Sequence, residues 1–291
     1  MNISWTLLLT TLVVTMASSM SAGGGSDKPM SIERNTCTAR DGVAIVYSAA
    51  GSGPVGLVFV HGGLANRTFW DGELKEFAAR YRVIAPDLVG HGESGTNRQR
   101  WGMPEFGADV QSVVETEKLK KVILFGNSLG GPVAIEAALL LPGKVLGVVG
   151  VDTFQSLSYK MTSQQARERA DAFRDNYAAS LKQMVQSLFH PDADPAIVAD
   201  AERRMARTSP QVAYSLFLSF GDYDVAASAR RLQVPLLAIN GDLYPTDTEA
   251  VRKVKPDFEV FVMKHTGHYP MLERPAEFDR LVATVVDRLT H

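Results

Sequence analysis

Residues 122–131 read VILFGNSLGG, and this stretch decides the fold. An apolar run of strand length leads into the segment Gly126–Gly130, and an Ala- and Leu-rich helical segment follows as far as Leu141. In this G-x-S-x-G pattern, the glycines on either side of Ser128 allow the sharp turn that joins a strand to a helix. The helix N-terminus then offers backbone N–H groups to developing negative charge. A serine that only caps the helix is the alternative, but the flanking strand and helix favour a nucleophile at Ser128.

Short apolar runs rich in β-branched residues recur along the chain. They cover residues 44–48, 56–60, 82–85, 121–125, 146–151, 236–239 and 259–263. Each is mostly apolar throughout, as in strands buried on both faces, which predicts a parallel sheet covered by helices. A turn signal at residues 41–42 precedes the first run, and Gly-Ser-Gly-Pro at 51–54 separates the first two runs. We therefore expect these early strands to form a hairpin.

Helical patterns fill the intervals between the strands. Core helices are expected at 104–118, 129–141 and 275–289, and further helices at 164–176, 179–189, 195–206 and 210–220. The second group occupies roughly 80 residues without strand rhythm, longer than an ordinary connection. Because the strand pattern then resumes, we interpret this stretch as an inserted helical cap. The domain organisation is then core at 23–152, cap at 153–233 and core again at 234–291.

A second strand ends in a glycine loop. Residues 57–70 read LVFVHGGLANRTFW. Acyl transfer needs two backbone N–H donors aimed at the oxyanion of the tetrahedral intermediate. We expect one from Leu129, directly after the serine, and the other from Gly63, with Leu64 as the alternative. His61 is expected to hold this loop in place rather than to act as a base.

A histidine late in the chain supplies the candidate base. Residues 262–278 read VMKHTGHYPMLERPAEF. His268 follows Gly267 in the loop between the last strand and the final helix, from which it can reach the sheet edge where Ser128 lies. Histidine exchanges protons near neutral pH, which suits a general base. His265 is the competitor, but it lies closer to the end of the strand, so His268 is preferred.

Composition and charge exclude several classes of partner. The chain has 291 residues, of which 45% are hydrophobic and 21% charged, as in ordinary globular proteins. A net charge of −2 provides no field that would attract nucleic acid, so no nucleic-acid partner is expected. The six histidines lack the paired spacing of a zinc site, so no metal is expected. The single cysteine, Cys37, cannot form an internal disulfide and is interpreted as a small strand residue.

The first 22 residues predict a secretory signal peptide. An apolar run at 5–16 precedes a small-residue stretch at 17–22, although the n-region contains no Lys or Arg. The run is too short to span a membrane, and no cysteine follows it that could carry a lipid. We therefore expect a secreted or periplasmic protein without a stable membrane anchor.

Together these segments resemble the α/β-hydrolase superfamily, in its cap-bearing branch. The matching segments are the His61-Gly62-Gly63 loop, DLVGHGES at 87–94, the turn around Ser128, and Gly267-His268-Tyr269-Pro270, within residues from about 41 to 289. The resemblance implies a mostly parallel eight-stranded sheet flanked by helices, with an inserted helical cap. It also implies a serine hydrolase that needs no cofactor. Asp87 and His91 match structural positions of the family and receive no catalytic role.

The acid of the triad is where the chain departs from the family. The family usually carries it after the strand at 236–239, in a Gly-x-x-Asp pattern, but this position holds Tyr244. Tyrosine cannot take the anionic role that stabilises an imidazolium. Asp152 directly follows the preceding strand, where certain lactone hydrolases and dehalogenases of the family carry their acid. We prefer Asp152, with Asp242 as the alternative and Asp247 third; capping of the first cap helix by Asp152 is the structural alternative.

The expected activity is hydrolysis of a small carboxylic ester or lactone through an acyl-enzyme intermediate. Ser128 argues against dehalogenases and epoxide hydrolases of this fold, which use an aspartate nucleophile. A carbon–carbon bond hydrolase, a cofactor-free haloperoxidase and a ligand-sensing receptor with little turnover remain as alternatives. An interfacial lipase is a weaker hypothesis, because aromatic residues in a cap more often pack than contact lipid.

Overall fold

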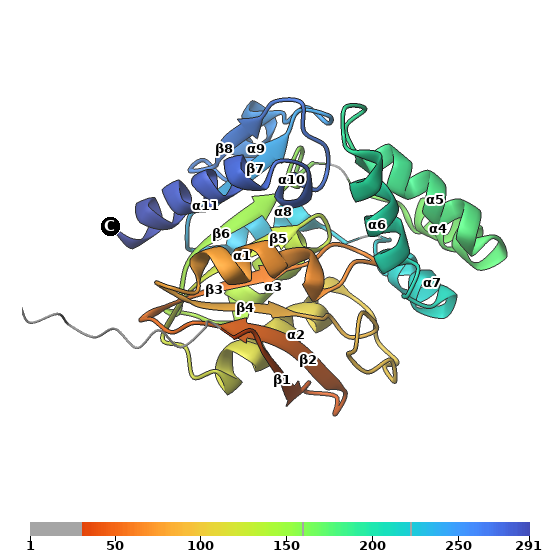
Figure 1. Ribbon diagram of the computed structural model, residues 1–291. Coiled ribbons are helices and arrows are strands. Elements are labelled where there is room, and N and C mark those ends of the chain that lie inside the picture. Colours follow the sequence, from red (N-terminus) through yellow and green to blue (C-terminus); the bar gives the residue numbers. More distant parts are fainter. Residues whose placement is uncertain (1–30, 159, 222) are drawn as a thin grey trace, which may run out of the picture.

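The structure, a computed structural model, describes residues 31–158, 160–221 and 223–291. The predicted signal peptide at 1–22 lies outside these residues. Within them, eight strands form one sheet in the order β1-β2-β4-β3-β5-β6-β7-β8 (Figure 1). The strands are β1 Glu33–Thr38, β2 Ala44–Ala50, β3 Val55–Val60, β4 Arg82–Pro86, β5 Lys121–Asn127, β6 Val145–Val151, β7 Leu236–Gly241 and β8 Glu259–Met263. From β4 to β8 all neighbours are parallel, so the predicted fold class is confirmed.

The hairpin predicted between the first two apolar runs is wrong. Those runs became β2 and β3, but β4 lies between them and pairs antiparallel with β2 and parallel with β3. The hairpin instead joins β1 to β2, with Cys37 opposite Ile45, and turns where the Ala39 N–H donates to the carbonyl of Val43. The apolar pattern missed β1 because this edge strand is largely exposed and its sequence, ERNTCT, is polar. Cys37 lies in β1 as predicted, and partial burial raises the pKa of its thiol to about 11.

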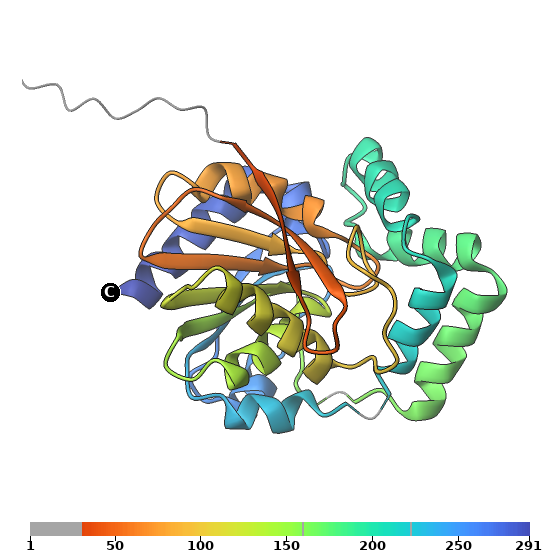
Figure 2. The same ribbon diagram turned by 90° about the horizontal axis from the view of Figure 1, so that it is seen from below.

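Helices cover both faces of the sheet. α2, α3 and α8 pack on one face, and α1 and α11 pack on the other, as the view in Figure 2 shows. Their bounds, with those of the smaller elements, are η1 Arg67–Trp70, α1 Asp71–Phe77, α2 Met103–Thr116, α3 Gly130–Leu140, α8 Val225–Arg231, α9 Thr248–Val254, α10 Pro270–Glu273 and α11 Pro275–Thr290. The three predicted core helices are α2, α3 and α11. The elements that the pattern missed have at most seven residues, too few to show a helical period.

Four helices follow β6 and lie together beyond the carboxyl ends of the parallel strands (Figures 1 and 2). They are α4 Ser163–Asp175, α5 Tyr177–Leu188, α6 Pro195–Met205 and α7 Pro210–Leu218, hereafter the helical insertion. Each begins at a residue whose side chain accepts a backbone N–H, as helix caps do. The predicted cap range, 153–233, also contains α8, but α8 packs against α3 and α9 of the core.

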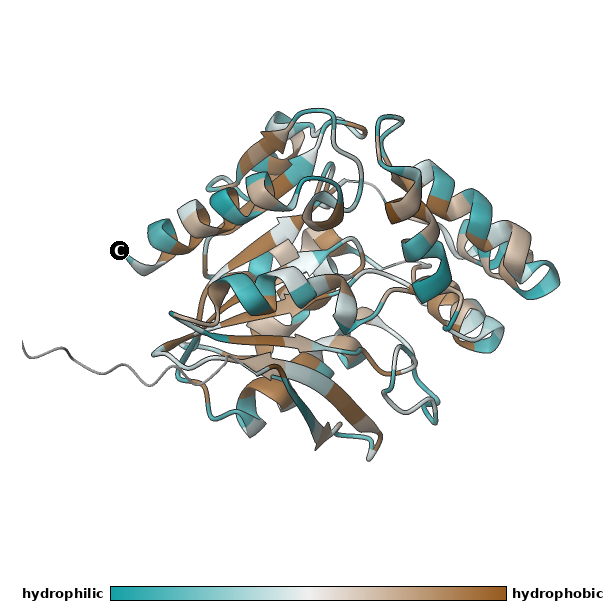
Figure 3. Cartoon of the chain, viewed as in Figure 1, coloured by the Kyte–Doolittle hydropathy of each residue, from teal (hydrophilic) through white to brown (hydrophobic). Residues whose placement is uncertain are grey.

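The central sheet is hydrophobic, and the outer elements are more hydrophilic. In Figure 3 the central strands are mostly brown, whereas the helical insertion is teal over much of its surface. The side chains of β5 and β7 are buried almost throughout, as a sheet covered on both faces requires. In the part of the chain that is described, every helix is too short or too polar to cross a membrane.

Candidate active site

Ser128 occupies a strained turn between β5 and α3. Its φ of +52° lies in the left-handed region, which non-glycine residues seldom adopt. A methyl group on Gly126 would lie 2.1 Å from the carbonyl oxygen of Gly130, and one on Gly130 would lie 2.4 Å from that of Val60. Both distances are far below contact, so only glycine fits at these two positions. The turn thus places Ser128 at the N-terminus of α3, at the carboxyl edge of the sheet.

Asp152 and His268 are hydrogen-bonded at the same edge. Nδ1 of His268 lies 2.6 Å from Oδ2 of Asp152, and the other carboxylate oxygen accepts the N–H of Gly241 at 3.0 Å. Both side chains are buried. A carboxylate can only accept, so Nδ1 carries the proton and Nε2 is left with its lone pair. This is the tautomer that a general base needs.

The other residues considered for the acid face elsewhere. Asp242 accepts the N–H of Thr266 at 3.2 Å, and Asp247 caps α9 by accepting the N–H of Ala250 at 2.9 Å. The hydroxyl of Tyr244 donates to the carbonyl of Ser187, at the end of α5, at 2.7 Å. Of the three predicted carboxylates, Asp152 is therefore the one bonded to His268. It does not cap the first helix of the insertion either, because Thr162 does.

Backbone contacts hold His268 in place. Its N–H donates to the carbonyl of Leu188 at 2.7 Å, and its carbonyl accepts Nδ2 of Asn127 at 2.9 Å. The same Asn127 amide also donates to the carbonyl of Val151, next to Asp152, at 2.9 Å. Asn127, the residue before Ser128, thus links the histidine loop to β6. Its amide was not recognised in the sequence, because the contact with His268 spans 141 residues.

Two cavities meet at Ser128. The first, of about 110 Å³, is lined by Gly63, Ser128, Arg169, Met184, Leu188, Phe217, Phe220, His268 and Tyr269. The second, of about 210 Å³, is lined by Met103, Ser128, Leu129, Pro132, Met161, Phe220, Tyr223 and Val225. The two expected oxyanion donors, Gly63 and Leu129, therefore each line one cavity beside the serine. Leu64, the alternative donor, is buried with a φ of +62° and lines neither cavity. Sequence analysis did not identify Arg169.

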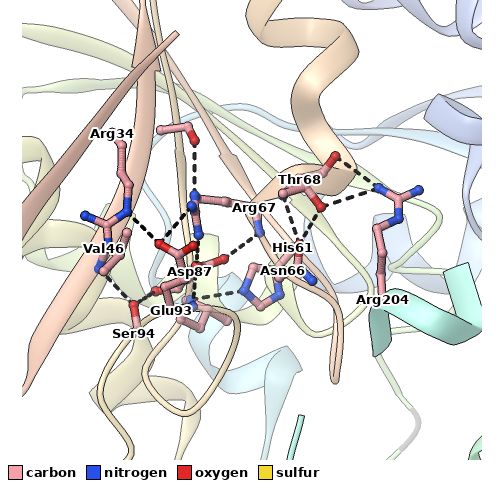
Figure 4. Close-up of polar contacts among 12 residues, drawn as sticks. Arg34, Val46, His61, Asn66, Arg67, Thr68, Asp87, Glu93, Ser94 and Arg204 are labelled. Carbon is pink, nitrogen blue, oxygen red and sulfur yellow. Dashed lines mark hydrogen bonds and ion pairs between the residues drawn. The ribbon is translucent and has the colours of Figure 1, made fainter. Parts of the chain in front are cut away.

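His61 joins the glycine loop to the segment after β4 (Figure 4). Its Nε2 accepts the N–H of Leu88 at 3.0 Å, and its Nδ1 donates to the carbonyl of Gly62 at 2.7 Å. Burial lowers the pKa of His61 to about 4, so the ring is neutral at physiological pH, as both bonds require. Burial likewise lowers the pKa of His91 to about 3; its ring centroid lies 5.0 Å from that of His61, with the two rings tilted. Both rings support the loop and lie outside the two cavities.

Asp87 is the centre of the buried network in Figure 4. Its carboxylate accepts the N–H of Arg67 at 2.7 Å and that of Glu93 at 2.8 Å, and it forms an ion pair with the Arg67 guanidinium. These bonds fix the segment that follows the glycine loop against the segment after β4. Asp87 thus braces the loop that carries Gly63, and it is not among the residues that line the cavities.

The structure also brings together side chains that the sequence separates. His190, Asp192 and His265 each offer a ligand atom, and these atoms lie within 4.8 Å of one another on the surface. The spacing argument against a metal site did not include this group, because 75 residues separate the two histidines. Among the described residues, this is the one group of at least three His, Cys, Asp or Glu side chains that could hold a metal ion. His265, the competing base, is therefore directed to Asp192 and is 71% exposed.

Comparison with known proteins identifies the family of the chain. The model of the alpha/beta hydrolase family matches residues 57–281, and the chain belongs to that family. It is 25% identical over 266 residues to 3-oxoadipate enol-lactonase 2 of Acinetobacter baylyi, covering 88% of this chain and 97% of that protein. It is 30% identical over 220 residues to a non-heme haloperoxidase of Rhodococcus erythropolis, covering 70% and 80%.

Two further matches differ in extent. A 96-residue stretch is 35% identical to an uncharacterized protein of Mycobacterium tuberculosis, but it spans only 28% of that protein's length and 33% of this chain. Among solved structures, a thermophilic esterase from Thermogutta terrifontis superposes with a TM-score of 0.79 at 22% identity, covering 88% of this chain and 99% of that one. The structural likeness concerns the fold, whereas the family match supports a hydrolase.

Proposed function

We propose that this protein is a serine hydrolase of small carboxylic esters or lactones. Ser128 is the nucleophile, His268 the base and Asp152 the acid, while the N–H groups of Gly63 and Leu129 bind the oxyanion. The observation that carries the proposal is the 2.6 Å bond between Asp152 and His268, beside a cavity that both His268 and Ser128 line. The lactonase relative supports the same class of substrate.

The reaction follows from these positions. Nε2 of His268 takes the proton of Ser128 as Oγ attacks the acyl carbon, and the Asp152 carboxylate stabilises the imidazolium that forms. The imidazolium then protonates the leaving oxygen as its bond to the acyl carbon breaks. Water, deprotonated by His268, attacks the acyl-enzyme; the acid leaves and the proton returns to Ser128. Atoms and charge balance without any cofactor.

The test measures turnover of short-chain aryl esters and of five- and six-membered lactones. We expect turnover by the wild type and a loss of about 10⁴-fold or more in kcat with Ser128→Ala. Mass spectrometry should find the acyl adduct on the peptide that contains Ser128. Equal activity of Ser128→Ala would overturn the proposal, and so would an adduct on another residue.

A haloperoxidase is the second candidate, because one of the relatives carries that name. Hydrogen peroxide would attack the acyl-enzyme in place of water, releasing a peracid that oxidises halide. The same triad would serve, so the discriminating measurement is peroxide-dependent bromination of monochlorodimedone in acetate buffer. A rate above that of ester hydrolysis would favour this candidate.

A further inference from the structure

We propose that the substrate is an ester whose leaving alcohol bears a carboxylate, bound by Arg169, and whose acyl chain is apolar. This inference rests on the proposed function. It follows from a difference between the two cavities that meet at Ser128: one contains the imidazole and a guanidinium, and the other is lined by apolar side chains.

The first cavity takes the leaving group. His268 must protonate the leaving oxygen, so that oxygen has to lie on the imidazole side of the serine. His268 lines the 110 Å³ cavity and is not among the residues that line the other. Its size suits a short hydroxy acid rather than a long alcohol. The acyl chain then extends past Leu129 into the 210 Å³ cavity.

Arg169 gives the leaving-group cavity its charge. Among the described residues that line this cavity, it carries the one permanent charge, and its neighbours Met184, Leu188 and Phe217 are apolar. The Tyr269 hydroxyl, which also borders the cavity, is directed to Sδ of Met205 at 3.6 Å. A carboxylate that enters this cavity therefore meets one cationic partner. Arginine suits this role, because its planar guanidinium binds carboxylates in a bidentate manner.

An aromatic platform orients the guanidinium. Cζ of Arg169 lies 4.8 Å from the centroid of Phe217, whose ring contacts Phe173 at 4.4 Å and Phe220 at 5.7 Å. A guanidinium stacked on a ring keeps its N–H donors around its edge, so it can bind a carboxylate in addition to its existing contacts. Arg169 is exposed, but it lies three residues after Ala166 and four before Phe173, two of the buried residues of α4, which places it on the side of the helix that borders the cavity.

The acyl cavity has the opposite character. Met103, Pro132, Met161 and Val225 line it with apolar groups. Its one tyrosine, Tyr223, donates its hydroxyl to Glu136 at 2.8 Å, so that polar group is already bonded within the protein. A charged acyl chain would lose its hydration there without a partner, which is strongly unfavourable.

The test uses two pairs of esters in a pH-stat. The first pair is 2-(butanoyloxy)acetate and its carboxamide, which differ only in the charge of the leaving group. The second is monomethyl succinate and methyl succinamate, which differ in the charge of the acyl chain. We expect the wild type to prefer the first anion over its amide by about 10–100-fold in kcat/KM, mostly through KM. The acyl anion should show no such preference.

Arg169→Gln should reduce the leaving-group preference to within about threefold. The matched variant Arg167→Gln should keep it, because Arg167 lies on the same helix and is also exposed but lines neither cavity. A preference that persists in Arg169→Gln overturns the proposal, as does a preference for the charged acyl chain. If the wild type cleaves none of the four esters and none of the aryl esters and lactones above, the proposed function has failed. A binding measurement then tests the role of Arg169. In calorimetry, the wild type should bind N-butanoylglycine about tenfold more tightly than its amide. Equal binding of the two overturns the inference.

Discussion

Oδ2 of Asp152 and Nδ1 of His268 lie 2.6 Å apart, although 116 residues separate them in the sequence. The carboxylate is 1% exposed, and its second oxygen accepts the N–H of Gly241. Asp152 has a φ of +44°, so the chain turns sharply directly after β6. A buried acceptor on a rigid strand end sets both the tautomer and the orientation of the imidazole.

This relationship predicts that Asp152→Asn will be almost inactive. The amide cannot stabilise an imidazolium and can donate to Nδ1, which selects the other tautomer. We expect kcat for ester hydrolysis to fall by about 10³–10⁴-fold, with a small change in KM. Steady-state kinetics with an aryl ester provides the measurement.

Asp242→Asn is the matched control, because Asp242 bonds the Thr266 backbone on the same sheet edge. It should keep kcat within about threefold of the wild type. Thermal unfolding of both variants must show that they fold. If Asp152→Asn retains activity while Asp242→Asn loses it, the assignment of the acid is wrong.

The proposed nucleophile could be placed from the sequence, whereas the choice of its proposed acid required the fold. Gly126, Ser128 and Gly130 lie within one turn, so sterics that act over a few residues reveal them. The choice among Asp152, Asp242 and Asp247 depends on which strand end faces His268, and this is a property of the whole sheet. Arg169 was missed for a similar reason, since its spacing on α4 does not indicate which cavity it lines.

Asn127→Ala should slow catalysis by removing the amide that holds the carbonyls of His268 and Val151. Both acceptors are buried, so the free energy of unfolding should fall by about 2 kcal/mol or more. A displaced histidine should lower kcat by about 10–100-fold with KM little changed. Steady-state kinetics measured well below the unfolding transition separates the loss of kcat from the loss of stability.

Asn66→Ala serves as the comparison for this variant. Asn66 is also buried, and its side chain accepts from the N–H and the hydroxyl of Thr68, away from His268. It should lose about 1 kcal/mol of stability and keep kcat within about threefold. A similar loss of kcat in both variants would mean that Asn127 acts through stability alone.

Gly126→Ala should unfold the turn that carries Ser128. The added methyl would lie 2.1 Å from the carbonyl oxygen of Gly130, and backbone must move to relieve the overlap. We expect a loss of about 3 kcal/mol or more in urea unfolding, together with loss of activity. Gly72→Ala, on α1, meets nothing within 4 Å and should stabilise by up to about 1 kcal/mol. Equal stability of the two variants would contradict this account of the turn.

Local patterns also explain which parts of the fold were predicted. The buried strands and the long helices carry strong periodicity, and β3, β5, α2 and α11 matched it closely. The pairing of β2 with β4, by contrast, joins Ser48 to Ala85 across a crossover, and no turn signal indicates it. The group of His190, Asp192 and His265 is likewise a product of tertiary structure.

Asp279 on α11 should make stability depend on pH. Burial, and then the nearby charge of Glu76, raises the pKa of Asp279 from its ordinary 3.8 to about 6. The pKa of Glu73, on α1, is also raised. Burial is the main cause, and the charges of Asp279 and Asp71 add to it. The native state therefore binds more protons than the unfolded state between these values, so stability falls as pH rises through this window.

Asp279→Asn should remove the part of this pH dependence that comes from Asp279. This rise in pKa corresponds to roughly 3 kcal/mol, but the side chain is partly exposed, so screening reduces the expected gain to about 1 kcal/mol. Urea unfolding should show that gain near pH 8 and little of it near pH 4, where the native Asp279 is protonated and the unfolded one is about half protonated. Asp287→Asn, on the exposed side of the same helix, should change stability by less than about 0.5 kcal/mol at either pH. An equal gain for Asp279→Asn at both pH values would show that its effect comes from packing rather than from charge.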